Sequence, residues 1–193
     1  MDKALLKDII LEQRRIQESL EPGIPRESLS SLEKYFSLPH SIVISGIRRS
    51  GKSTLLSQII KNHYKDNYYY FNFEDERLIE FKAEDFNVLY EILIELYGEK
   101  KTFFLDEIQN VPKWESFVRR LQDAGCKFFI TGSNASLLSR ELGSKLTGRT
   151  IISELYPFSF REFLVFKGVS VKKDSLSLTQ ERALIKKNFN EYL

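Results

Sequence analysis

The chain has 193 residues, a length that suits one domain with a buried core and leaves too little for two full domains. Hydrophobic residues make up 42% of it and charged residues 29%, which is typical of a folded globular protein and excludes a disordered tail. The formal net charge of +2 is too small to indicate a nucleic-acid-binding surface by itself, and a single cysteine excludes a disulfide framework and a cysteine metal site.

The N-terminal segment, residues 1–38, is expected to be helical and to pack on the rest of the chain. Leu6 and Ile9 belong to an apolar pattern near the 3.6-residue period, which predicts an amphipathic helix over residues 3–20. The sequence EPGIP ends this helix, and a second short helix is predicted from Arg26 onward. The acids inside the first helix are unlike a secretory signal, and no apolar run reaches the roughly 20 residues of a membrane span. We therefore expect a cytoplasmic protein with no membrane partner.

Apolar strands alternate with helices over residues 39–168, the expected central domain. The predicted strands cover residues 41–45, 68–73, 101–106, 127–131 and 150–155. The predicted helices cover residues 52–65, 86–98, 112–125, 135–146 and 160–168. Strands that are apolar throughout and separated by helices indicate a parallel sheet covered on both faces. The sequence therefore predicts a three-layer α/β fold.

The last segment, residues 169–193, is expected to be a C-terminal helical segment. Its final helix opens with a candidate capping box formed by Ser177 and Gln180. This helix has no stop signal before the last residue, so we expect the chain to be the first part of a longer protein.

A glycine-rich turn, GIRRSGKST, lies between the strand at 41–45 and the helix at 52–65 and fits G-x-x-x-x-G-K-[ST] at every fixed position. Glycines let backbone amides point at a polyphosphate, the lysine reaches the β- and γ-phosphates, and the first hydroxyl of the helix is a ligand for Mg²⁺. The turn is therefore predicted to bind ATP or ADP. The predicted nucleotide-binding residues are Gly46, Ile47, Arg48, Arg49, Ser50, Gly51, Lys52, Ser53 and Thr54.

Two adjacent carboxylates end the apolar strand FFLDE. Strand ends of this kind lie at the carboxyl edge of a parallel sheet, where α/β proteins build their sites. We predict that Asp106 holds Mg²⁺ together with Ser53, and that Glu107 orients and polarises the water that attacks the γ-phosphorus, with Lys52 as the catalytic cation. In the alternative interpretation the pair only caps the next helix.

Three more polar residues are candidates for catalysis. Ser133 and Asn134 follow the strand KFFIT, where they are expected to sense the γ-phosphate or, alternatively, to cap the helix that follows. Arg149 precedes the fifth strand and is either an arginine presented across a subunit interface or an ordinary surface residue, with Arg140 as the weaker candidate.

The segments GIRRSGKSTLL, FFLDEIQNVPKWESFVRRLQDAG, FFITGSNASLLSRELGSKLTGRT and ELYPFSFREFL, in this order, resemble the prokaryotic ATPases of the AAA+ superfamily over roughly residues 40–166. The resemblance implies the P-loop strand order 5-1-4-3-2. It also implies that Arg149 acts in trans within a homo-oligomer. Members of the family usually continue into a C-terminal domain of uncertain function, so we expect substrate choice and assembly to depend on that region. The functional residues that the resemblance carries over are Gly51, Lys52, Ser53, Thr54, Asp106, Glu107 and Ser133.

The main hypothesis is therefore a Mg²⁺-dependent ATPase whose hydrolysis drives a conformational change. The alternative is a nucleotide-gated interaction or DNA-binding regulatory module with little hydrolysis of its own. A kinase or small GTPase fits less well, because the guanine-binding pattern N-K-x-D is absent from the sequence and Glu107 beside Asp106 suits attack by water. Residues 8–26 are expected to contribute to the adenine pocket.

Overall fold

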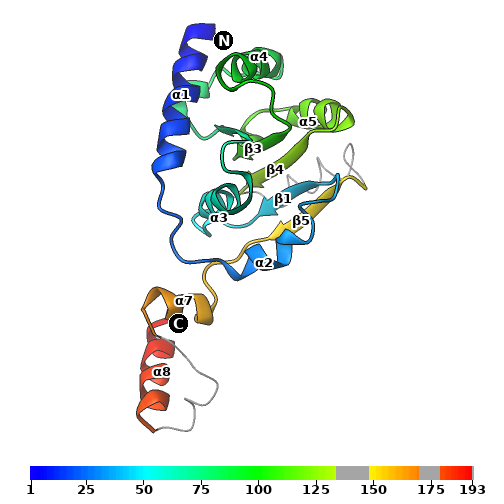
Figure 1. Cartoon of the computed structure of the whole chain (residues 1–193). Coiled ribbons are helices and arrows are strands. Elements are labelled where there is room, and N and C mark those ends of the chain that lie inside the picture. Colours follow the sequence, from blue (N-terminus) through cyan, green and yellow to red (C-terminus); the bar gives the residue numbers. More distant parts are fainter. Residues whose placement is uncertain (134–147, 170–178, 193) are drawn as a thin grey trace.

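The structure is a computed structural model that describes residues 1–133, 148–169 and 179–192 (Figure 1). Its five strands are all parallel and form one sheet in the order β2-β3-β4-β1-β5. Counted from the other edge, this is the predicted order 5-1-4-3-2, so the predicted α/β P-loop fold is confirmed. The strands are β1 (Ser41–Ser45), β2 (Tyr69–Asn72), β3 (Thr102–Asp106), β4 (Lys127–Gly132) and β5 (Thr150–Glu154).

Helices cover both faces of the sheet. The helices are α1 (Lys3–Ser19), α2 (Glu27–Glu33), α3 (Lys52–Ile59), α4 (Asp85–Tyr97), α5 (Trp114–Asp123), α7 (Phe160–Phe166) and α8 (Thr179–Tyr192). Apolar side chains of α1, α4 and α5 form one core with the sheet, and those of α2 and α3 form the other. Figure 1 shows α7 and α8 extending beyond the β5 side of the sheet.

Alternating side chains of the strands divide between these two cores. Phe103 of β3 stacks on Phe128 of β4 on the face covered by α4 and α5, whereas Phe104 stacks on Phe129 on the face covered by α3. Successive residues of a strand point to opposite faces, so a strand that is apolar throughout must be covered on both. This is the physical reason why the continuous apolar strands of the sequence predicted three layers.

The edge strand β2 is protected by α1. The side-chain amide of Gln13 donates a hydrogen bond of 2.9 Å to the carbonyl of Asn72 and accepts one of 2.9 Å from the amide of Asn72. Open strand edges pair readily with other chains, and this reciprocal contact satisfies one residue of the edge internally. None of the helices in the described part of the chain is both long and apolar enough to cross a membrane.

Some element boundaries differ from the prediction. The helix expected over residues 52–65 is α-helical only to Ile59 and ends in the π-helical turn η1 (Ile60–Tyr64), because Lys65 adopts a positive φ of 46° that cannot continue a helix. The helix expected from Pro112 begins at Trp114. The short 3₁₀ helices η2 (Glu76–Leu78) and η3 (Ile108–Asn110) have no counterpart in the prediction. The helix expected over residues 135–146 and the residue Ser177 lie outside the described residues.

Candidate functional site

The sheet topology brings three strand ends together at its carboxyl edge. Strand β4 pairs with β1 through Gly132 opposite Ser45, and with β3 through Ile130 opposite Leu105. The residues that follow each strand therefore converge on one place, which is where α/β folds bind ligands. The predicted phosphate turn follows β1, the acidic pair ends β3, and Ser133 follows β4.

The turn after β1 requires both of its glycines. A Cβ atom on Gly46 would lie 2.2 Å from the carbonyl oxygen of Leu155, and Gly51 has a φ of 91°. Arg49 also has a positive φ, 65°, which is a strained conformation for a residue with a side chain and is frequent at functional sites. The hydroxyl of Ser50 is buried without a hydrogen-bond partner within the described part of the chain. A buried polar atom of this kind can accept a ligand without losing an internal contact.

The side chain of Lys52, the first residue of α3, contacts the backbone of this turn. Its ammonium Nζ donates to the carbonyls of Gly46 and Ile47, each at 3.2 Å, and lies 3.2 Å from Oε1 of Glu107. The side chain is only 4% exposed. The cation is therefore held by the same turn that is predicted to surround the phosphates.

Asp106 is a buried carboxylate surrounded by hydroxyl groups. It is 1% exposed, its Oδ1 accepts a short hydrogen bond from the hydroxyl of Thr131, and its Oδ2 lies 3.4 Å from the hydroxyl of Tyr70. Burial raises the pKa of Asp106, and the hydroxyls of Thr131 and Ser53 only partly oppose this effect. An ionised carboxylate in this position is a costly group that a bound cation would stabilise.

The pKa of Glu107 is shifted in the opposite direction to that of Asp106. Desolvation raises its pKa, but the hydrogen bond from Gln109 and the charge of Lys52 outweigh that effect, so the pKa of Glu107 is lowered. Its Oε2 accepts from Nε2 of Gln109 at 2.6 Å and from the amide of Ser133 at 3.1 Å. The residue has a left-handed backbone (φ 51°) and its side chain makes no capping hydrogen bond to η3, so the interpretation of this carboxylate as a helix cap is wrong.

The remaining predicted residues divide into three groups. The backbone amide of Ser133 donates to Glu107, and its predicted role at the γ-phosphate stays a prediction. Asn134 and Arg140 lie outside the described residues. Arg149 forms an ion pair with Asp123, is 48% exposed and precedes the amino-terminal end of β5, at the edge of the sheet opposite the phosphate turn. It cannot reach the site of its own chain, so its predicted role requires a second chain.

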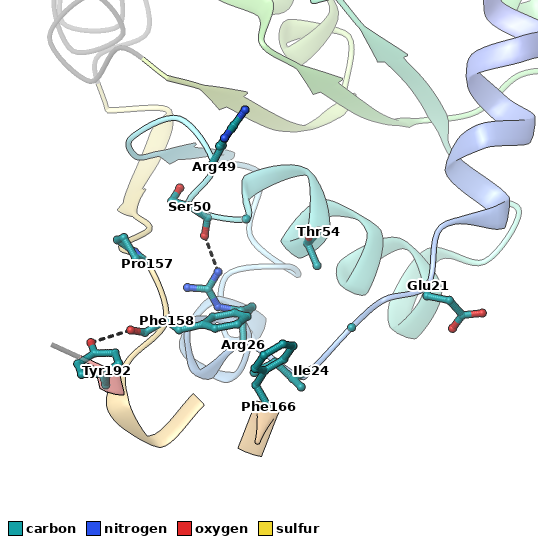
Figure 2. Close-up of a pocket in the computed structure, with 12 residues that line it drawn as sticks. Glu21, Ile24, Arg26, Arg49, Ser50, Thr54, Pro157, Phe158, Phe166 and Tyr192 are labelled. Atoms are coloured by element: carbon teal, nitrogen blue, oxygen red, sulfur yellow. Dashed lines mark hydrogen bonds between the residues drawn. The ribbon is translucent and has the colours of Figure 1, made fainter. Parts of the chain in front are cut away.

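A cavity of about 780 Å³ opens beside the phosphate turn. Figure 2 shows Ser50 and Thr54 on one side of it, and Arg26, Phe158 and Phe166 on the other. This volume lies within the usual range for small-molecule sites, roughly 300–1,000 Å³. The cavity is lined by Glu21, Gly23, Ile24, Arg26, Arg49, Ser50, Gly51, Thr54, Pro157, Phe158, Phe166 and Tyr192.

Several residues of the site were missed by the sequence analysis. Thr131 and Gln109 hold the acidic pair, and Arg26 contacts the phosphate turn from the N-terminal segment. Thr131 is polar at the end of an otherwise apolar strand, which was a usable signal. Arg26 depends on contacts between distant segments. The contact of Gln109 is with Glu107, two residues before it, and no motif in the sequence marked it.

The chain is similar to several known proteins. The profile of a family described as "AAA domain" matches residues 39–164. An uncharacterized protein of Methanocaldococcus jannaschii is 42% identical over 192 residues, which are 99% of this chain and 42% of that protein. An uncharacterized protein of Haemophilus influenzae is 40% identical over 162 residues, which are 78% of this chain and 37% of that protein. The chain thus spans about two fifths of the length of these relatives.

Solved structures of DnaA are among those that superpose on the chain. Domain III of DnaA from Thermotoga maritima has a TM-score of 0.46 and 16% identity, covering 77% of this chain and 71% of the other. AMPPCP-bound DnaA from Aquifex aeolicus has a TM-score of 0.45 and 17% identity, covering 78% and 53% respectively.

Proposed function

The chain belongs to the AAA domain family, and from this premise we propose that it binds and hydrolyses ATP with Mg²⁺ and couples hydrolysis to a conformational change. The observation that carries the proposal is that Lys52 pairs with Glu107 directly beside the buried Asp106. Nζ of Lys52 lies 3.2 Å from Oε1 of Glu107, and the buried Asp106 immediately precedes Glu107. Hydrolysis of a triphosphate needs a phosphate-binding cation, a metal-binding acid and a group that orients water, and these three residues supply them.

The phosphates would be held by the turn and by Lys52. In the structure the ammonium interacts with two turn carbonyls and with Glu107. A polyphosphate is a stronger partner for a lysine than a carbonyl oxygen, because the hydrogen bond is then between two charged groups. We expect the ammonium to exchange these contacts for phosphate oxygens, with the buried hydroxyl of Ser50 as a further donor.

The oxygen groups near Asp106 fit Mg²⁺. This ion prefers hard oxygen ligands and is usually held by one or two carboxylates together with phosphates and water. Asp106 and Ser53 would hold the ion, which when bound neutralises phosphate charge.

Glu107 is suited to orient the attacking water. Its lowered pKa keeps the carboxylate ionised at neutral pH, so that it can accept a hydrogen bond from water. The amide of Ser133 and the side chain of Gln109 fix one carboxylate oxygen. The other oxygen faces Lys52 and becomes available when Lys52 moves to the phosphates.

The adenine base would enter the cavity beside the turn. Ile24, Phe158 and Phe166 offer an apolar and aromatic lining for a flat ring. In this proposal residues 39–168 form the ATPase domain. The N-terminal segment 1–38 lines the base pocket with Ile24, and the C-terminal segment 169–193 lines it with Tyr192.

Phosphate release from ATP by the wild-type chain and by Glu107→Gln tests the proposal. We expect Glu107→Gln to lower turnover about 100-fold or more while ATP affinity changes little, because the substitution removes the charge that polarises water but keeps the shape. Glu74→Gln, an exposed glutamate that pairs with Arg48, is the matched control and should leave turnover unchanged. Full turnover by Glu107→Gln would reject the assignment.

A nucleotide-gated interaction module is the second candidate. One observation favours it: both carboxylate oxygens of Glu107 have partners within the chain. Oε1 pairs with Lys52, and Oε2 accepts from Gln109 and Ser133. If a bound nucleotide does not release the carboxylate, the chain would bind ATP without hydrolysing it. Tight ATP binding without phosphate release, with and without DNA present, would favour this candidate.

A further inference from the structure

Arg26 is a buried arginine that joins three segments of the chain. It is 4% exposed and precedes the first residue of α2. Its guanidinium donates from Nε to Oε1 of Glu162 at 2.9 Å, from Nη1 to the carbonyl of Ser50 at 2.6 Å, and from Nη2 to the carbonyl of Tyr156 at 2.7 Å. Figure 2 shows Arg26 between the phosphate turn and Phe158, whose ring lies 5.1 Å from the guanidinium carbon.

Glu162, in the first turn of α7, is fully engaged by this network. Besides Arg26, its Oε1 accepts from the amide of Glu27 at 2.9 Å and its Oε2 from the amide of Ser159 at 2.7 Å. Burial raises the pKa of Glu162, but the hydrogen bonds from Ser159 and Arg26 have the larger effect. The pKa of Glu162 is therefore lowered. Buried ion pairs add little net stability, because desolvation offsets their attraction. The main effect of the pair is therefore to fix the geometry of the groups that it joins.

The contact with Ser50 determines how the phosphate turn presents its backbone. The peptide bond between Ser50 and Gly51 is trans, so its carbonyl and its N–H point in opposite directions. Because the carbonyl points at Arg26, the N–H of Gly51 points away from Arg26. The contact is close: a Cβ atom on Gly51 would lie 2.7 Å from Nη1 of Arg26.

We propose that Arg26 is a positioning residue for the phosphate turn: it holds the carbonyl of Ser50 outward, so that the amide of Gly51 faces the β-phosphate, and through Glu162 it makes this orientation depend on the docking of α7. The inference rests on the proposed nucleotide binding, since it assigns a role within that site. Coupling between two sites is reciprocal, so bound nucleotide also stabilises the docked position of α7.

ADP affinity of the full chain, measured by calorimetry with Mg²⁺, tests this role. Arg26→Lys keeps the charge but cannot reach the three acceptors in the same geometry, and we expect it to weaken ADP binding about tenfold. Arg14→Lys is the matched control. Arg14 is also mostly buried, pairs with Glu18 and lies 3.9 Å over the ring of Tyr68, but it contacts the opposite edge of the sheet. We expect this control to change ADP affinity less than twofold.

Hydrogen exchange gives a readout that a purely structural role would not change. ADP should slow exchange of the amides of residues 156–166 in the wild-type chain but not in Arg26→Lys. If Arg26→Lys does not fold, Glu162→Gln replaces it, since this variant keeps the shape of the partner and removes its charge; it should weaken ADP binding about threefold.

The outcomes separate this inference from the proposed function. If the wild-type chain binds neither ADP nor ATP, the proposed function fails. If the wild-type chain binds ADP, and Arg26→Lys or its replacement Glu162→Gln binds it equally well, the inference about Arg26 is wrong and the proposed function stands. Equal loss of ADP affinity in the Arg26→Lys and Arg14→Lys variants would also overturn it, because a general loss of stability would then explain both.

Discussion

Lys52 and Glu107 form an ion pair across the site, with Nζ of Lys52 3.2 Å from Oε1 of Glu107. Both side chains are almost buried, with exposed fractions of 4% and 11%. The pair holds the cation that would bind phosphate against the carboxylate that would orient water. In the proposed function, Lys52 exchanges this contact with Glu107 for contacts with the phosphates when the nucleotide binds.

Removal of this cation should strongly weaken nucleotide binding. We expect Lys52→Ala to weaken ATP binding about 100-fold, because the triphosphate loses its buried cationic partner and Glu107 keeps an uncompensated charge. Calorimetry or a fluorescent ATP analogue measures this. Lys101→Ala, which removes an exposed lysine paired with Glu99, is the control and should bind ATP normally. Tight ATP binding by Lys52→Ala would exclude the turn as the phosphate site.

Replacement of Asp106 should stabilise the nucleotide-free protein. Because burial raises the pKa of Asp106, the folded state holds this proton more tightly than the unfolded state, and stability falls as the pH rises past the ordinary aspartate pKa. The charged form is therefore costly at neutral pH, where a tenfold difference in acid constant is worth about 1.4 kcal/mol. Asp106→Asn keeps the shape and removes this cost.

Thermal unfolding of Asp106→Asn at several pH values measures the effect. We expect a higher melting temperature than that of the wild-type chain at pH 7, and a difference that vanishes below about pH 4, where the wild-type carboxyl is protonated. The additional stabilisation that Mg²⁺ gives to the ADP-bound wild-type chain should be absent from the variant. An unchanged response to Mg²⁺ would show that Asp106 does not hold the ion.

Thr131 should be needed for both stability and turnover. Its hydroxyl donates to the carboxylate of Asp106 and accepts from the backbone amide of Glu107 at 3.0 Å, so one side chain contacts both residues. Thr131→Val removes the hydroxyl at nearly constant volume, so Oδ1 of Asp106 and the amide of Glu107 both lose this hydrogen-bond partner. We expect a loss of about 2 kcal/mol in urea unfolding and a clear fall in turnover. Thr131→Ser retains the hydroxyl and should restore both; a serine variant as impaired as the valine variant would contradict the assigned contacts.

The fold was predictable because its determinants are local. Each strand is a short apolar run bounded by turn residues, and the phosphate turn has fixed spacing between Gly46 and Ser53. The acids were predictable for the same reason: Asp106 and Glu107 follow directly from an apolar strand, and parallel strands place their carboxyl ends at one edge.

The contacts within the site were not predictable in the same way. Arg26 meets Glu162, 136 positions further along the chain, and this pairing depends on how the segment after β5 returns to the start of α2. Glu107, which accepts from Gln109, has a left-handed backbone that a residue with a side chain adopts rarely. Periodicity and motif spacing contain no information on either feature.

We expect Arg149 to contribute to hydrolysis in the site of a neighbouring chain. It lies before the amino-terminal end of β5 and pairs with the half-exposed Asp123, at the edge of the sheet opposite Lys52. We expect Arg149→Ala to lower turnover about 1,000-fold, as is usual for an arginine that stabilises charge on the transferred phosphate, while ATP affinity is kept. Asp123→Ala, which frees the arginine, should not lower turnover.

Mixing two inactive variants tests the arrangement directly. Arg149→Ala keeps an intact Glu107, and Glu107→Gln keeps an intact Arg149, so a mixed oligomer contains interfaces in which both groups are present. We expect the mixture to regain part of the turnover that each variant lacks, with a dependence on protein concentration that follows assembly. A mixture that stays inactive while light scattering shows mixed oligomers would exclude Arg149 as a residue acting in trans, because every other requirement for its action would then be met.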